Sequence, residues 1–133
     1  MILVDSNIPM YLVGAHHPHK ADAQRLLEKL VSERQRLVTD AEVLQEILDR
    51  YTAINRREAI SLVIKVTLEV MDDVFHVEKT DALRAAEIAE NRRLFTARDA
   101  VHIVVMERRG VESIMSFDAD FDRWPGLQRI HQL

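Results

Sequence analysis

Short runs rich in apolar residues alternate along this chain with longer stretches in which apolar residues recur every three or four positions. Residues 2–4 read Ile-Leu-Val, and comparable short runs lie at 37–39, 74–77, 113–116 and 127–130. Runs of this kind are typical of strands in a parallel sheet, because helices bury both faces of such a sheet. The pattern therefore predicts four strands and a short fifth.

The stretches between these runs have helical spacing. Helices are predicted near Pro9 and over residues 21–34, 41–51, 56–69, 81–90 and 96–109. Thr39 or Asp40 is expected to cap the third of these helices, Thr80 the fifth, and Gly110 to end the last. Strands that alternate with helices indicate an α/β fold, here an α/β/α sandwich with a mainly parallel sheet of four or five strands.

The chain has 133 residues, of which 47% are hydrophobic, and this predicts a single domain over residues 1–133. The absence of cysteine excludes disulfides and thiolate metal sites within this sequence. The N-terminal residues do not resemble a signal peptide, and no apolar run approaches a membrane span. We therefore expect a cytoplasmic protein without a membrane partner.

Acidic side chains occur where the predicted strands end. Asp5 follows the first apolar run directly, and Asp118 follows the fourth. Glu42 and Glu46 are four residues apart in the helix after the second strand, so they share a face. Asp99 lies near the start of the helix that leads into the fourth strand. Ligands bind at the carboxyl ends of strands in open α/β sheets, so four segments bring carboxylates to one edge.

A carboxylate cluster of this kind suits Mg²⁺ or Mn²⁺, which are hard cations that prefer oxygen ligands. Such ions polarise a phosphate, lower the pKa of a bound water and stabilise a leaving oxygen. Each acid alone also has a structural interpretation, as a turn former, a solvated helix charge, a helix N-terminal charge or a loop acid. The inference of a metal site therefore depends on their convergence.

The histidines give a weaker indication. His16, His17 and His19 form a short tract of the kind that can bind metal, but clustered loop histidines are usually exposed to solvent. His102 lies three residues after Asp99 and so shares its helix face. For His102, a histidine packed in the core is favoured over a partner of the acidic site.

The charge balance excludes nucleic-acid binding by bulk charge, because the net charge is −4 and the sequence pI is about 5.8. Local phosphate contacts could come from basic residues, of which Arg98 is the strongest candidate because it neighbours Asp99. Aromatic residues are only 5% of the chain, which argues against extended base stacking. The other basic candidates are Arg56, Arg57, Arg92, Arg93, Arg108 and Arg109.

Four segments, in order, carry a resemblance to a known family. They are residues 1–7 (MILVDSN), 38–48 (VTDAEVLQEIL), 97–102 (ARDAVH) and 114–122 (IMSFDADFD). The sequence resembles the PIN-domain ribonucleases, and within them the VapC toxins of type II toxin–antitoxin systems. The resemblance covers essentially the whole chain.

The resemblance implies that Asp5, Glu46, Asp99 and Asp118 are the catalytic, metal-binding acids of an Mg²⁺- or Mn²⁺-dependent RNA endonuclease. It also implies a homodimer that a cognate VapB-like antitoxin holds inactive. We expect Ser6, Asn7 and Ser116 to position the metal, water or phosphate, Glu42 to assist Glu46, and Arg98 to support the site. Asp122 is an additional acid for which the resemblance implies no role.

Two alternatives belong to other functional classes. The first is a catalytically inactive PIN-like module that binds protein or RNA. The second is a phosphoacceptor signalling domain, which needs an acid pair after the first strand, an acceptor aspartate after the third and a lysine after the fifth. Here Asp72 and Asp73 precede the third strand, and no lysine follows Asp81. The sequence therefore argues against the second alternative.

Overall fold

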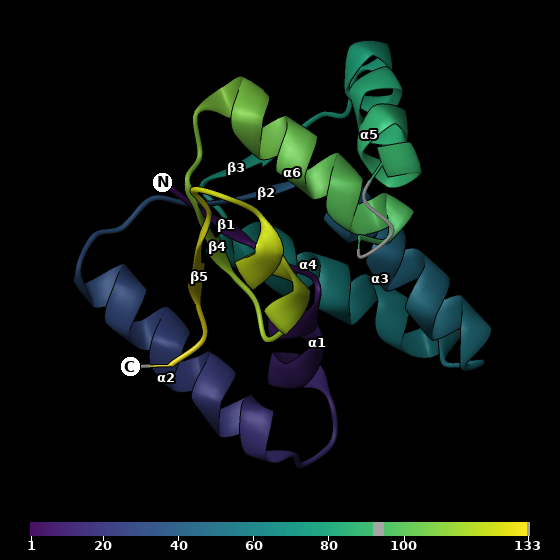
Figure 1. Ribbon diagram of the computed structural model, residues 1–133. Helices are drawn as coiled ribbons and strands as arrows, with labels where there is room; N and C mark the ends of the chain where they lie inside the picture. The colour runs from purple at the N-terminus through teal and green to yellow at the C-terminus, as the bar shows by residue number, and fades with distance from the viewer. Residues whose placement is uncertain (92–94, 133) are drawn as a thin grey trace.

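The computed structural model describes residues 1–91 and 95–132. Its strands are β1 (Ile2–Val4), β2 (Leu37–Asp40), β3 (Asp73–Phe75), β4 (Ser113–Met115) and β5 (Gln128–Ile130). Its α-helices are α1 (Asn7–Val13), α2 (Pro18–Ser32), α3 (Ala41–Ala53), α4 (Ile60–Val70), α5 (Lys79–Asn91) and α6 (Ala97–Arg109) (Figure 1). Two 3-10 turns complete the described elements, η1 (Arg57–Ala59) and η2 (Ala119–Arg123).

All five strands form one parallel sheet in the order β3-β2-β1-β4-β5, which confirms the predicted architecture. The N-terminal strand β1 lies in the centre, where Leu3 is opposite Val38 on one side and Ile114 on the other. The chain extends the sheet first through β2 and β3 and then through β4 and β5. The strand order therefore reverses between β1 and β4, at the edge where open α/β sheets bind ligands.

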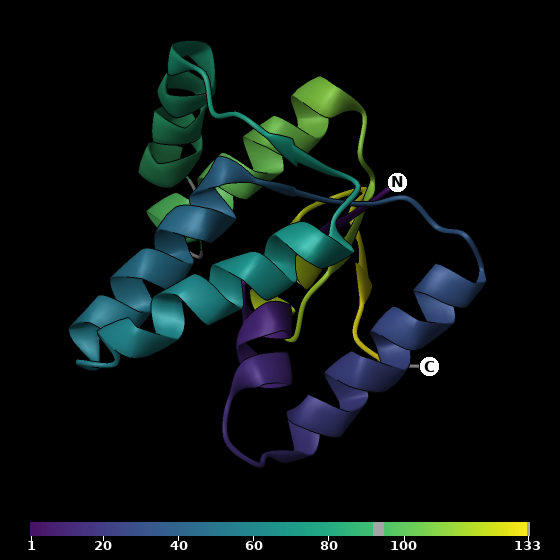
Figure 2. The ribbon, with the colours of Figure 1, turned by 180° about the vertical axis from the view of Figure 1, so that it is seen from behind.

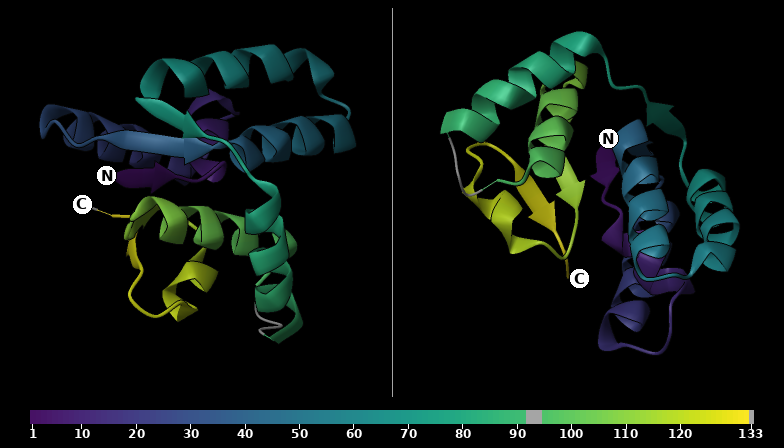
Figure 3. Two further views of the ribbon diagram at one scale, coloured as in Figure 1. Left: turned by 90° about the horizontal axis from the view of Figure 1, so that it is seen from above. Right: turned by 90° about the vertical axis from the view of Figure 1, so that its right-hand side faces the viewer.

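Helices cover both faces of this sheet, as Figure 3 shows. Alternate residues of β1 point to opposite faces. Leu3 faces a core formed mainly with α5 and α6, which includes Ile103. Ile2 and Val4 face a second core formed with α1 and α2, which includes Leu27. Because β1 is apolar on both faces, it is held at the centre of the molecule with its carboxyl end fixed.

Helices α3 and α4 lie side by side as an antiparallel pair (Figure 2). Val43 and Ile47 of α3 pack against Val63 of α4 in a third, smaller core. Helix α3 starts directly after β2, because Asp40 Oδ1 accepts a hydrogen bond from the Val43 backbone N–H at 2.9 Å. The capping residue at the end of β2 is thus Asp40, one of the two predicted alternatives.

The start of α5 differs from the prediction. Thr80 does not cap this helix, since α5 already begins at Lys79. Instead, Asp81 in the first turn reaches back and accepts a hydrogen bond from the Glu78 backbone N–H at 2.8 Å. The end of α6 agrees with the prediction, because Gly110 adopts the left-handed conformation with φ of 68°.

Two other helices have different bounds from those expected. Helix α2 begins at Pro18, earlier than predicted, because proline suits the first helical turn and the His17 side chain accepts a hydrogen bond from the His19 backbone N–H. The single helix expected over residues 56–69 is divided into η1 and α4. No helix within the described part of the chain is long and apolar enough to cross a membrane.

Candidate metal centre

The ends of β1 and β4 are joined through Asp5. Ser116 Oγ donates a hydrogen bond to Asp5 Oδ2 at 2.6 Å, and Asn7 Nδ2 donates to the same oxygen at 3.3 Å. The other carboxylate oxygen, Asp5 Oδ1, accepts from the Ser6 backbone N–H at 2.8 Å. The structure therefore brings together the predicted residues of the first and fourth segments, and it fixes both oxygens of Asp5.

Glu46, on the second turn of α3, reaches the same place. Ser6 Oγ donates a hydrogen bond to Glu46 Oε2 at 2.5 Å. The other oxygen, Glu46 Oε1, lies 2.6 Å from Nε2 of His102, which is on α6. Glu46 is thus a buried carboxylate held from two sides, by the start of α1 and by α6.

His102 lies inside the acidic site and is fully buried. Its Nδ1 is 2.7 Å from Asp40 Oδ2, and its Nε2 is 3.8 Å from Asp5 Oδ1. Burial favours the neutral ring, but the charge of Asp40 and the hydrogen bonds to Asp40 and Glu46 outweigh it, so the pKa of His102 is raised well above its usual value of 6.5. The ring is buried as the favoured interpretation expected, but its contacts with Asp40 and Glu46 make it a partner of the site as well.

Asp99 gathers with the acids that follow β4. Carboxylate oxygens of Asp99, Asp118 and Asp120 lie within 4.8 Å of one another. Two backbone bonds shape this loop, since the Asp118 N–H donates to Ser116 Oγ at 3.0 Å and the Asp120 N–H donates to Asp118 Oδ1 at 2.9 Å. Asp120 is an acid to which the sequence assigned no role in the site.

One oxygen of Asp99 has no partner. Thr96 Oγ caps α6 by accepting from the Asp99 backbone N–H at 3.2 Å, but Asp99 Oδ2 is buried without a hydrogen bond. Within residues 1–91 and 95–132, no other buried side-chain nitrogen or oxygen is left in this state. Burial and the charge of Asp118 raise the pKa of Asp99 to about 6. A carboxylate that is costly to ionise and lacks a donor is a fitting ligand for a cation.

A second group of side chains suited to a metal, Asp5, Glu46 and His102, has ligand atoms within 4.8 Å of one another and adjoins the group that contains Asp99. Burial raises the pKa of Asp5, the charge of His102 opposes this shift, and the charge of Glu46 adds to it. The charge of Asp5 in turn raises the pKa of Asp99. The four acids expected from the sequence therefore lie in one electrostatic environment that a divalent cation would relieve.

Glu42 and Arg98 lie at the margin of the site. Glu42 is half-buried, and burial raises its pKa, with smaller effects from His102 and Glu46. Arg98 forms an ion pair with Asp49 of α3 and is close enough to Glu46 and Glu42 for their charges to raise its pKa. The structure thus places Arg98 beside the acids, whereas a phosphate contact through Arg98 stays a prediction.

Several of the other basic candidates are engaged elsewhere. Arg56 pairs with a nearby glutamate at 2.5 Å, and Arg108 pairs with a buried aspartate of α5. Arg109 lies over an aromatic ring of β3, with its guanidinium carbon 4.1 Å from the ring centroid. Arg92 and Arg93 lie outside the described residues.

The histidine tract is packed against aromatic rings and does not join the acids. The His19 ring stacks on Phe117 with centroids 4.1 Å apart, and the His17 ring lies 4.8 Å from that of Tyr11. In the described part of the chain, neither group of side chains suited to a metal includes these histidines. A metal site in this tract therefore has no support from the structure.

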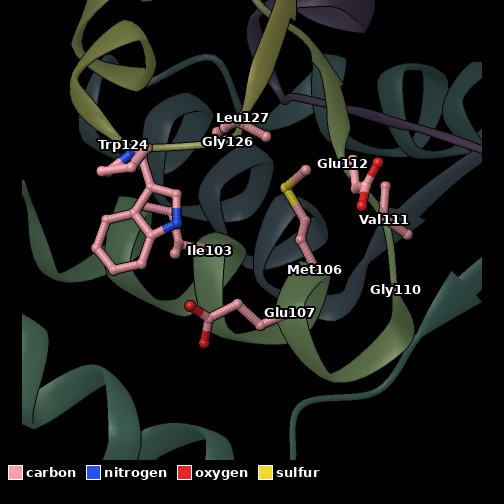
Figure 4. A pocket seen from close by; sticks show the side chains of 10 residues that line it. Ile103, Met106, Glu107, Gly110, Val111, Glu112, Trp124, Gly126 and Leu127 are labelled. Carbon is pink, nitrogen blue, oxygen red and sulfur yellow. The ribbon is translucent and has the colours of Figure 1, made fainter.

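Two further features lie apart from the acids. Asp122, the acid without a role, accepts hydrogen bonds from Arg129 at 2.8 and 3.0 Å. A hollow of about 330 Å³ lies near the C-terminal end of α6, between Met106, Gly110 and Trp124 (Figure 4). None of the four acids lines this hollow. The hollow is therefore separate from the candidate metal centre at the carboxyl edge of the sheet.

Comparison with known proteins assigns the family. A sequence model of the PIN domain matches residues 2–127. Ribonuclease VapC13 of Mycobacterium tuberculosis is 55% identical over 130 residues, which cover 98% of this chain and 99% of that protein. Among solved structures, VapC20 of Mycobacterium tuberculosis, described as a sarcin-ricin loop cleaving toxin, superposes with a TM-score of 0.76 at 22% identity, covering 92% of this chain and 93% of that one.

A second solved structure is VapBC2 from Rickettsia felis bound to a DNA fragment from their promoter. It superposes with a TM-score of 0.75 at 14% identity and covers 100% of both chains. At these identities the structures show a shared fold, while the sequence model and the relative at 55% identity establish descent. This chain belongs to the PIN domain family and, within it, to the VapC ribonucleases.

Proposed function

We propose that this protein is a metal-dependent endoribonuclease that acts as the toxin of a type II toxin–antitoxin system. The observation that carries the proposal is a pair of adjoining groups, one with Asp5 and Glu46 and the other with Asp99 and Asp118, in which Asp99 Oδ2 is buried and unpartnered. The name of VapC13, which is a ribonuclease at 55% identity, supports the same reaction.

These four acids fit one or two Mg²⁺ or Mn²⁺ ions, held directly or through water. The fit depends on the donor set, because carboxylate oxygens are the ligands that both ions prefer. It also depends on Asp99, because its Oδ2 is buried without a partner and burial raises its pKa to about 6. When bound, the metal lowers the pKa of a water molecule and stabilises negative charge on the phosphate.

The other side chains hold the acids in place. Ser116, Asn7 and the Ser6 backbone N–H fix Asp5, and Ser6 Oγ fixes Glu46, so the two carboxylates keep their orientation before substrate arrives. Preorganised ligands of this kind reduce the reorganisation needed for the reaction. At the margin, Glu42 assists Glu46, and Arg98 supplies positive charge for an RNA phosphate.

The partners follow from the same assignment. RNA is the substrate, and a VapB-like antitoxin is the cognate inhibitor, which the fold shared with VapBC2 of Rickettsia felis supports. A homodimer stays a prediction from the family resemblance, and sedimentation equilibrium of the purified protein would test it. We place the enzyme in the cytoplasm with its RNA substrate.

The experiment is cleavage of a mixed pool of structured RNAs by wild type and by Asp5→Asn, with Mg²⁺, Mn²⁺ or EDTA. We expect discrete cuts by wild type that need the metal, and none by Asp5→Asn, because the amide removes a negatively charged ligand. Asp122→Asn is the matched control, since Asp122 is an exposed acid paired with Arg129, and it should cleave as wild type does.

Metal-dependent cleavage by Asp5→Asn would contradict the assignment of the site. If wild type cuts no RNA in any condition and binds no divalent metal, the proposal of an enzyme fails and an inactive binding module is favoured instead.

A further inference from the structure

We propose that His102 is a positioning residue that holds Glu46, is itself held by Asp40, and thereby sets the metal affinity of the site. This inference rests on the proposed function, because it takes Glu46 to be a metal-binding acid. It concerns two side chains, Asp40 and His102, that are not among the four acids.

The contacts form a continuous chain across three elements. Asp40 ends β2, His102 lies in the middle of α6, and Glu46 is on α3. The two ring nitrogens of His102 bridge the carboxylates, with Nδ1 2.7 Å from Asp40 Oδ2 and Nε2 2.6 Å from Glu46 Oε1. Each ring nitrogen is therefore within hydrogen-bond distance of a carboxylate oxygen.

Asp40 is a fixed anchor for this chain. Its Oδ1 caps α3 through the Val43 backbone N–H, and its Oδ2 accepts from His102. Asp40 and His102 are both 0% exposed, so water does not compete for either group. Because α3 also carries Glu46, Asp40 positions the backbone of Glu46 through the cap and the carboxylate of Glu46 through the His102 ring.

This arrangement restricts a flexible side chain. A glutamate loses considerable rotamer freedom when it becomes ordered, and that loss opposes metal binding if it occurs only when the metal arrives. Here Glu46 Oε1 is held by His102 and Oε2 by Ser6 before any metal is bound. Groups that orient metal ligands in this way change affinity by about 10- to 100-fold when they are removed.

The geometry favours a positioning role over direct coordination by His102. Asp5, Glu46 and His102 have ligand atoms within 4.8 Å of one another, but Nε2 of His102 is already engaged by Glu46 at 2.6 Å and the ring is enclosed. The unpartnered oxygen is Asp99 Oδ2, which belongs to the group that contains Asp118. The position open to a cation is therefore on the Asp99 side of the site, and His102 supports Glu46 from the side of the protein core.

Two substitutions distinguish the contact of His102 with Asp40 from its contact with Glu46. The amide of His102→Gln reaches about as far as Nε2 and retains a donor for Glu46. The amide of His102→Asn lies near the place of Nδ1 and retains a donor for Asp40 only. Ile103→Val is the matched control, because Ile103 is a buried neighbour on α6 and the change loosens the core without touching a polar contact.

The readout is the dissociation constant of Mn²⁺ for the metal-free proteins, measured by calorimetry, together with kcat and KM for RNA cleavage and the midpoint of thermal unfolding without metal. We expect His102→Asn to weaken Mn²⁺ binding by about 10- to 100-fold and to lower kcat more than it raises KM. His102→Gln should recover most of the affinity, and Ile103→Val should bind Mn²⁺ as wild type does.

Equal Mn²⁺ affinity in His102→Asn and wild type would overturn the inference, as would an equal loss in His102→Asn and His102→Gln. Electron spin echo spectra of bound Mn²⁺ add a second check, because coupling to a directly coordinated nitrogen that His102→Gln abolishes would make His102 a ligand and overturn the positioning role. If wild type binds no Mn²⁺, the proposed function fails too, whereas a failure of the His102 variants alone leaves the nuclease assignment intact.

Discussion

Asp81 of α5 and Asp99 of α6 are both buried in the first turn of a helix, but their carboxylates have opposite surroundings. Asp81 accepts two hydrogen bonds from Arg108, at 2.8 and 2.9 Å, and one from the Glu78 backbone N–H. The Arg108 bonds lower the pKa of Asp81 below its usual value. Asp99 has an unpartnered oxygen and carboxylate neighbours, and its pKa is raised to about 6.

The difference teaches what each site is organised to do. The partners of Asp81 come from the same chain, so its charge contributes to the stability of the folded protein. One carboxylate oxygen of Asp99, Oδ2, is left without a partner within the described residues, so ionising this side chain costs stability until a cation arrives. Burial alone therefore does not distinguish these two acids, whereas the unpartnered oxygen of Asp99 does.

The largest expected effect comes from replacing the unpartnered acid. Asp99→Asn should reduce RNA cleavage by at least about 100-fold, because it removes a charged ligand while conserving shape. Initial rates with Mg²⁺ or Mn²⁺ would measure this loss. Asp120→Asn is the comparison within the same group of acids, and because Asp120 also pairs with Arg123, we expect it to lose less than about 10-fold. Equal losses of cleavage in Asp99→Asn and Asp120→Asn would contradict the claim that Asp99 matters more than its neighbour Asp120.

The partnered acid should show the reverse pattern. Asp81→Asn should lower the free energy of unfolding by about 3 kcal/mol, because it leaves Arg108 without its buried partner. Urea unfolding at pH 7 would measure the change, and cleavage by the folded variant should be unaffected. Arg84→Met removes an exposed ion pair of the same helix and should change the free energy by less than about 1 kcal/mol. A loss of cleavage with unchanged stability in Asp81→Asn would break the comparison.

The smallest effect is a pH dependence of the metal-free protein. Because the folded pKa of Asp99 is about 6 and its usual value is 3.8, the folded state binds more protons between these values, and stability falls as the pH rises through this window. In EDTA at pH 7.5, Asp99→Asn should be more stable than wild type by on the order of 2 kcal/mol, and the gap should close towards pH 4.

The Asp81 contribution has the opposite sign. Its folded pKa is lowered, so the stability that it supplies is present above its usual pKa of 3.8 and is lost only as the pH falls through the folded value. In urea unfolding from pH 4 to pH 7.5, the stability gap between wild type and Asp99→Asn should grow with pH, whereas the gap for Asp81→Asn should stay constant, because the whole range lies above 3.8. If the difference in unfolding free energy between wild type and Asp99→Asn does not change over this range, the raised pKa of Asp99 is contradicted.

The parts of the fold that the sequence predicted are those with local signals. The apolar run at residues 2–4 predicted the central strand correctly. The third strand was predicted at residues 74–77 and lies at residues 73–75. The start of α5 was wrong because Thr80 offers a common capping side chain, whereas the actual contact runs backwards from Asp81 to Glu78. The end of a helix depends on which of several possible local hydrogen bonds forms, and the sequence alone does not show which one is preferred.

The part of the site that could be predicted is the part that depends on where strands end and on residue spacing within helices. Asp5 and Asp118 follow apolar runs, and the structure places them at one edge as expected. The contact between His102 and Asp40 joins residues 62 positions apart, and no periodicity specifies such a pair. The available signal was the spacing of Asp99 and His102 on one helix face, and it left the second partner of the ring unidentified.

The central place of β1 has a consequence for the newly made chain. Asp5 is held by Ser116, which is 111 residues later, and β1 pairs with β4 as well as with β2. A ribosome that has translated the first hundred residues has therefore made a strand whose second neighbour does not yet exist. The acidic site therefore cannot be complete on the nascent chain until residues 113–118 have emerged, because Asp5 needs β4 and Ser116 as its neighbours.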